Sequence, residues 1–233
     1  MHEILDEFGK LVKLKYLNIS TNGNVILPEC ISKLIALEEL HFADGYLETI
    51  PESFGALKKL KILNFIAGRL KSLPNSIGNL VLLKEFYFSA GEMTSVPSSF
   101  KNLKSLKLLS IFGNQFPSFP IEFCSLTNLE DLIIRFDYGD SLNWGALPTA
   151  IGNLKKLKTL RITSAGITEL PDAIGSLIQL ETLELQFNQL TSLPASISKL
   201  TKLKDLNIMG NPIPKESIPG IKALLPAGCI VTI

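Results

Sequence analysis

The chain has 233 residues, 46% of them hydrophobic, and its 23 basic and 22 acidic residues leave a formal net charge of +1. This composition excludes an intrinsically disordered protein and is sufficient for a sizeable core. Nucleic-acid binding requires a basic surface that neutralises phosphates, and no basic run occurs. We also expect no membrane insertion, because no apolar stretch approaches the roughly 20 residues that span a bilayer.

The chain begins with apolar residues at Ile4, Leu5 and Phe8. They fit the second half of a repeat that recurs further on, without its first half. We therefore expect residues 1–10 to form a partial repeat or an N-terminal cap. The same half-repeat also fits a point at which a longer array was cut, and this alternative stays open.

Residues 11–213 contain nine repeats, each opened by a leucine. The opening leucines are Leu11, Leu34, Leu57, Leu80, Leu103, Leu126, Leu154, Leu177 and Leu200. Their spacing is 23 residues everywhere except once, where it is 28. Self-similarity at this period predicts a stacked array in which neighbouring repeats share one hydrophobic core.

The third repeat, residues 57–79, shows how one unit is expected to fold. Leu63 and Phe65 lie two residues apart, which predicts a short strand over residues 62–66 with these two side chains pointing inward. Pro74 is expected to open a helical or 3₁₀ turn, where its missing N–H costs nothing. Stacking such units predicts one parallel β-sheet.

The corner that follows each strand is irregular in composition. Its residues are Asn22, Gly45, Gly68, Gly91, Asn114, Asp137, Ala165, Asn188 and Asn211. An Asn amide can bond backbone groups of two adjacent repeats, whereas glycine allows the turn but offers no side-chain bond. We therefore expect bound water and a softer backbone at the glycine corners.

The sixth repeat contains five additional residues within 137–144. Counting back from Leu147 places Trp144 in a core column, which predicts a buried ring beside the insertion. An exposed aromatic lip at the rim is the alternative.

After the ninth repeat, residues 214–233 are predicted to form a C-terminal cap, with a helical turn over 219–225 and a final strand over 229–233. The whole chain, 1–233, is then a single repeat domain.

The pattern LxxLxxLxLxxNxLxxLPxxIxxL, present over about residues 11–213, resembles the 23-residue class of leucine-rich repeat proteins. This class includes plant intracellular Ras-group proteins and bacterial repeat proteins. The resemblance implies an α/β repeat fold, a right-handed solenoid shaped like a curved horseshoe, with a parallel β-sheet on the concave face and short helical or 3₁₀ turns on the convex face. The resemblance to the Ras-group proteins also suggests a small GTPase as one candidate partner.

Motifs that support catalysis or metal binding do not occur in this sequence. Its two histidines are His2 and His41, and it has no glycine-rich phosphate loop, HExxH stretch or GxSxG elbow. We expect no enzymatic activity, no cofactor and no metal.

The three cysteines, Cys30, Cys124 and Cys229, are isolated and odd in number. Cys30 and Cys124 lie beside hydrophobic columns, which predicts buried free thiols. The compartment is then reducing, or one in which disulfides are not used. No signal-peptide segment occurs at the start, so the localisation is unassigned, with a slight preference for the cytoplasm and with bacterial export still open.

Outward strand positions carry the functional signal. In repeats three to six, six of twelve are apolar or aromatic, against three of fifteen in the other repeats. A contiguous exposed apolar patch indicates an interaction site, and aromatic residues and Arg anchor interfaces. The predicted partner-binding residues are Ile62, Ile66, Tyr87, Leu108, Phe112, Ile133, Arg135 and Phe136. Arg135 and Arg161 are expected to face acidic groups of the partner.

The sequence therefore predicts a non-enzymatic module that binds another protein through its central concave face. Two alternatives stay open. The chain could be the recognition arm of a larger enzyme or signalling protein truncated at its N-terminus, or a structural protein that self-associates.

Overall fold

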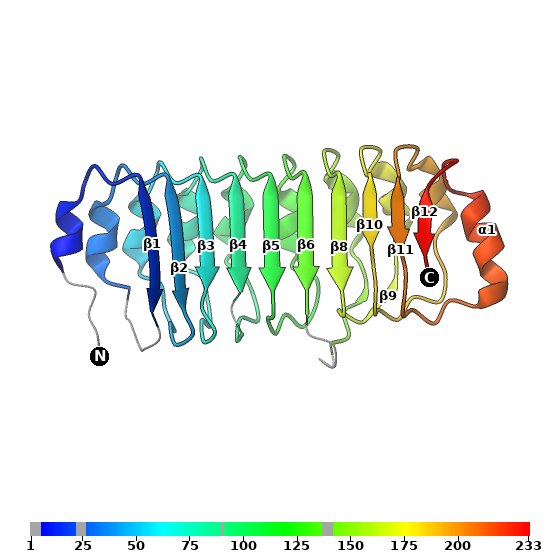
Figure 1. The fold of residues 1–233 in the computed structure, drawn as a ribbon, viewed down its shortest axis with the longest axis horizontal. Coiled ribbons are helices and arrows are strands. Elements are labelled where there is room, and N and C mark those ends of the chain that lie inside the picture. Colours follow the sequence, from blue (N-terminus) through cyan, green and yellow to red (C-terminus); the bar gives the residue numbers. More distant parts are fainter. Residues whose placement is uncertain (1–5, 22–26, 90, 137–141) are drawn as a thin grey trace. The chain divides into compact units, whose positions relative to one another are not determined.

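The computed structural model describes residues 6–21, 27–89, 91–136 and 142–233, which form two compact units, Met1–Phe116 and Pro117–Ile233. Within each unit, parallel strands form one layer and short helical turns form the other (Figure 1). The expectations for Ile4, Leu5, Asn22 and Asp137 fall on residues that lie outside these described ranges.

Unit 1 contains a parallel sheet in which each strand pairs with the next one along the chain. Its strands are β1 (Tyr16–Thr21), β2 (Glu39–Asp44), β3 (Ile62–Ile66), β4 (Glu85–Ser89) and β5 (Leu108–Phe112). Its 3₁₀ turns are η1 (Asp6–Lys10), η2 (Glu29–Lys33), η3 (Glu52–Ala56), η4 (Asn75–Asn79) and η5 (Ser98–Asn102). Each paired strand residue lies opposite the residue at the equivalent position of the neighbouring strand. Equivalent positions therefore form straight columns across the strands.

Unit 2 follows the same plan. Its main strands are β6 (Asp131–Arg135), β8 (Thr159–Thr163), β10 (Thr182–Glu184), β11 (Asp205–Asn207) and β12 (Ile230–Thr232). A second, two-stranded sheet pairs β7 (Gly145–Ala146) with β9 (Ile167–Glu169). The helical turns are η6 (Ile121–Ser125), η7 (Thr149–Asn153), η8 (Asp172–Ser176), η9 (Ala195–Lys199), η10 (Lys215–Ser217) and α1 (Ile218–Ala223). Helix α1 and strand β12 lie where the sequence predicts them.

The predicted direction of the side chains in the third repeat is confirmed. Leu63 and Phe65 are fully buried, whereas Ile66 is 51% exposed. Pro74 precedes η4 in an extended conformation, and its carbonyl accepts a hydrogen bond of 3.0 Å from the Ile77 N–H. Proline suits this position because the turn uses its carbonyl and does not need an N–H.

The glycine corners of unit 1 are closed by direct backbone packing. A Cβ atom added at Gly91 would lie 2.7 Å from the Gly68 carbonyl oxygen, and one added at Gly68 would lie 2.9 Å from that of Gly45. Real Cβ atoms do not approach so closely, so Gly68 and Gly91 leave no room for an asparagine side chain. The bound water expected there stays a prediction.

The predicted state of two cysteines is also confirmed, because Cys30 and Cys124 are buried free thiols. Burial, with a smaller contribution from the Glu122 charge, raises the pKa of Cys124 to about 12 and keeps this thiol neutral. In the part of the chain that the structure describes, no helix is long and apolar enough to cross a bilayer.

Candidate functional site

The outward face of the unit 1 sheet carries most of the residues that the sequence singles out. Ile66 and Phe112 are 51% and 39% exposed, which is high for large apolar side chains on strands. Ile62, Tyr87 and Leu108 are partly exposed on the same face. Within unit 1 the structure therefore brings together five of the predicted residues, and we call them the patch.

A hollow of about 350 Å³ lies within the patch. Its lining residues are Asn64, Ile66, Tyr87, Phe88, Ser89 and Phe112. The register explains it, because Ser89 pairs with Ile66 on one side and with Phe112 on the other. A small side chain between two large ones in one column leaves an open space above itself. Sequence reasoning missed Ser89, although the column reads Ile-Ser-Phe in the repeats.

Two carboxylates on this face are held by neighbours on their own strands. The Tyr87 hydroxyl donates a hydrogen bond of 2.9 Å to Glu85 Oε2 on β4. On β2, His41 Nε2 lies 2.6 Å from Glu39 Oε1. His41 Nδ1 lies 3.5 Å from the amide nitrogen of Asn64, which links this pair to β3. Both carboxylates thus have a fixed orientation and retain lone pairs for a ligand.

Lysines lie just before the strands of unit 1. The Lys61 ammonium is 2.6 Å from Glu38 Oε2, and Lys15 is 3.5 Å from the other oxygen of the same carboxylate. Hydrogen bonding and attraction from Lys61 lower the pKa of Glu38. This rim is therefore partly neutralised by its own ion pairs.

Unit 2 contains the remaining predicted residues. Ile133 is partly exposed and Arg135 is exposed, both on the outward face of β6. Phe136 is only 6% exposed, and its ring lies 5.2 Å from that of Trp144. Its ring is therefore part of the core, and the expectation of a surface contact at Phe136 does not fit this burial.

Trp144 is itself 6% exposed and contacts Phe119 edge to face at a centroid distance of 5.7 Å. The core interpretation of Trp144 is confirmed, and the alternative of an exposed lip is wrong.

Arg161 differs from its expected role. Its Nε atom lies 3.0 Å from Glu184 Oε1, in an ion pair between adjacent strands of unit 2. The positive charge expected to face a partner's acidic group is already engaged within the unit.

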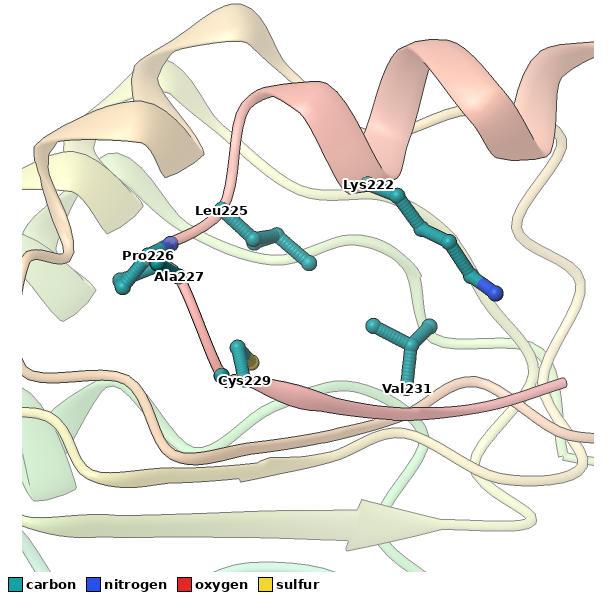
Figure 2. A pocket seen from close by; sticks show the side chains of 7 residues that line it. Lys222, Leu225, Pro226, Ala227, Cys229 and Val231 are labelled. Carbon is teal, nitrogen blue, oxygen red and sulfur yellow. The ribbon is translucent and has the colours of Figure 1, made fainter.

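A second hollow, of about 260 Å³, lies at the C-terminal end of unit 2 between α1 and β12 (Figure 2). Its lining residues are Lys222, Leu225, Pro226, Ala227, Gly228, Cys229 and Val231. Burial, followed by the charge of Asp205, raises the pKa of Cys229. This thiol is thus a poor nucleophile near neutral pH. Among the described residues, no group of three His, Cys, Asp or Glu side chains could hold a metal ion.

Stacked repeats that each contribute one parallel strand and one 3₁₀ turn define a class of proteins in which neighbouring repeats share a continuous core. The family model described as leucine-rich repeat region matches residues 1–89 and 142–225, more than half of the chain. The chain therefore belongs to the leucine-rich repeat family, and both the predicted family and the solenoid fold are confirmed. A search of curated proteins finds no significant match.

Solved structures are similar over most of the chain. An internalin, InlF, from Listeria monocytogenes is 19% identical, with a TM-score of 0.76 over 98% of this chain and 63% of the internalin chain. A chain in the octameric complex of Latrophilin 3, Unc5D and FLRT2 is 25% identical, with a TM-score of 0.77 over 94% of this chain and 69% of that one. A TDR receptor is 26% identical, with a TM-score of 0.67 over 90% of this chain and 37% of the receptor chain. The chain spans less than two thirds of the internalin and receptor chains.

Proposed function

We propose that this chain is a non-enzymatic module that binds another protein on the outward sheet face of unit 1. The observation that carries the proposal is the patch with its hollow, where two large apolar side chains, Ile66 and Phe112, stay exposed on either side of Ser89. Exposed apolar groups of this kind mark interaction sites on soluble proteins. The similarity to a receptor and to a component of a multiprotein complex supports the same class of function.

In unit 2, Ile133 and Arg135 are proposed as further contacts, because both reach solvent from the outward face of β6. Neither favours a small GTPase over another protein as the partner. The recognition arm of a larger protein would use the patch in the same way. Self-association is a different outcome, in which a second copy covers the patch.

The test compares wild type with the double variant Ile66→Glu/Phe112→Glu. A matched control is Ile35→Glu/Val81→Glu, because Ile35 and Val81 are 59% and 50% exposed but lie outside the strands. Proteins retained on immobilised wild type, patch variant and control are quantified by mass spectrometry. We expect a defined set to be lost only from the patch variant, since each added carboxylate would have to be desolvated in the interface.

Light scattering behind a sizing column is run on the same three proteins. A wild-type dimer that becomes monomeric only in the patch variant would assign the patch to self-association. Identical retained proteins and identical masses for all three would overturn the proposal.

A further inference from the structure

We infer that the partner presents to this face a segment with one basic side chain, bound by Glu85, and one bulky apolar side chain, inserted into the hollow above Ser89. This inference rests on the proposed function and adds the chemistry of the partner. It follows from the charges on the face, from the register, and from the distance between the two subsites.

Apart from His41, which lies against Glu39, the ionisable groups at the outward strand positions of unit 1 are acidic or are the Tyr16 and Tyr87 hydroxyls. The outward strand positions of unit 1 are 16, 18 and 20 on β1, 39, 41 and 43 on β2, 62, 64 and 66 on β3, 85, 87 and 89 on β4, and 108, 110 and 112 on β5. Glu39 and Glu85 are the acidic residues among these fifteen positions, and none is Lys or Arg. A partner of complementary charge therefore carries a cation.

The surroundings of Glu85 favour such a cation. The register places Glu85 between Ile62 and Leu108, so apolar side chains flank the carboxylate on both sides. The Tyr87 hydroxyl occupies one acceptor site of Glu85 and fixes its direction. A carboxylate has about four acceptor sites, so a guanidinium or an ammonium can still bind. A partner that covers Ile62 and Leu108 would lower the local dielectric and strengthen this pair.

The hollow selects the second side chain. Strands two apart lie roughly 9.6 Å from each other, since neighbouring strands are about 4.8 Å apart. Between Ile66 and Phe112 this distance leaves room for one inserted side chain above Ser89, and the walls are an isoleucine and two aromatic rings. A Leu, Met, Phe or Trp side chain fits this lining, because it buries apolar surface without leaving a polar group unpaired.

The spacing between the subsites limits the segment. Glu85 and Ser89 are four residues apart on β4, roughly 13 Å at about 3.3 Å per residue. In an extended segment, a basic and an apolar residue four positions apart lie on the same side and match this spacing of roughly 13 Å. Lys84 and Lys107 are exposed just before Glu85 and Leu108. They would repel a run of cations, which favours a single basic residue.

The experiment selects random linear peptides displayed on phage against wild type, with subtraction against Ile66→Glu/Phe112→Glu. We expect enriched peptides with one Arg or Lys four residues from a bulky apolar residue. The affinity of synthetic copies is then measured by fluorescence polarisation. Ser89→Trp, which fills the hollow, should weaken binding by about tenfold or more. Glu85→Gln should weaken it by about three- to tenfold and reduce its salt dependence.

Matched controls separate these effects from loss of folding. Ser20→Trp changes the same column on β1, and Glu29→Gln removes an exposed carboxylate from η2; both should bind like wild type. Enriched peptides without a basic residue, or peptides whose affinity is unaffected by Glu85→Gln, would overturn the inference and leave the proposed function standing. The absence of any enrichment over the patch variant would overturn the inference, while the retention experiment decides the proposed function separately.

Discussion

At the residue scale, the corner after each strand is built in two different ways. In unit 2 the amide of Asn188 donates hydrogen bonds of 2.8 and 3.0 Å to the carbonyls of Ile162 and Leu185. Its Oδ1 accepts bonds of 3.1 Å from the N–H groups of Ala165 and Ile167. With a longer bond of 3.3 Å to the Gln186 carbonyl, this one side chain contacts five backbone groups of two adjacent repeats. In unit 1 the glycine corners pack backbone against backbone instead.

Glycine is also required where η4 contacts η5, and this leads to a test. A Cβ atom at Gly78 would lie 2.3 Å from the Ser99 carbonyl oxygen, so Gly78→Ala must push η4 and η5 apart. We expect a loss of about 1–3 kcal/mol in the free energy of unfolding, the usual cost of overpacking. Thermal unfolding followed by circular dichroism measures it.

The control for Gly78→Ala is Gly45→Ala, because a Cβ atom there meets nothing within 4 Å. This change should be neutral or slightly stabilising, since alanine reduces the freedom of the unfolded chain. Equal melting temperatures for the two variants would contradict the close packing of the turns.

At the element scale, each strand separates a buried column from an outward one. Leu63 is fully buried, so Leu63→Ala should cost about 2–5 kcal/mol in the free energy of unfolding. Ile62, its neighbour on β3, points outward and is partly exposed, so Ile62→Ala should cost clearly less. Urea titration of both variants measures the difference. An equal loss would mean that the assignment of inward and outward positions is wrong.

The alternation of inward and outward residues along each strand was predictable from the sequence. The expectation of a surface contact at Phe136 did not follow this alternation. Phe136 has the same parity as the buried Leu132 and Ile134 on β6, and the equivalent Ala67 of the third repeat is fully buried. The alternation therefore indicated an inward Phe136. The core position of Trp144 was predictable for the same reason, since it followed from its column.

Contacts within a column, between equivalent residues of adjacent repeats, were harder to predict. The pairing of Arg161 with Glu184 is set by the register, which places the two residues opposite each other on β8 and β10. The hollow over Ser89 depends on the sizes of its two neighbours rather than on Ser89 itself. Both features can be predicted only by comparing the side chains at equivalent positions of adjacent repeats. The backbone packing at the glycine corners depends on a few tenths of an ångström, which a residue pattern does not contain.

At the scale of the whole molecule, the charges are nearly balanced and several are paired across adjacent repeats. Lys61 lowers the pKa of Glu38, and Lys204 lowers that of Glu181. The backbone N–H groups of Ser76 and Asn75, at distances of 2.9 and 2.8 Å, lower the pKa of Glu52. Hydrogen bonding to Glu130 raises the pKa of Lys158. These groups lie at the surface, so each contributes little by itself.

These shifts predict how stability depends on pH. The lowered pKa of Glu38, Glu52 and Glu181 in the folded state stabilises the fold above the ordinary glutamate value of 4.5, and this contribution is lost as the pH falls through the lower folded values. The raised pKa of Lys158 acts in the opposite direction: its contribution is present below 10.5 and is lost as the pH rises through the higher folded value. We expect a plateau in the melting temperature between these limits.

Glu52→Gln tests the acid side of this plateau most directly, because a neutral amide does not titrate. The variant should melt below wild type at neutral pH, since its bonds to Ser76 and Asn75 are no longer charge-assisted, and the two melting temperatures should converge as the pH falls towards 3. Calorimetry across this range measures both curves, with Glu29→Gln as the matched control on another turn. A constant difference between Glu52→Gln and wild type at every pH would show that this carboxylate does not stabilise η4 through its charge.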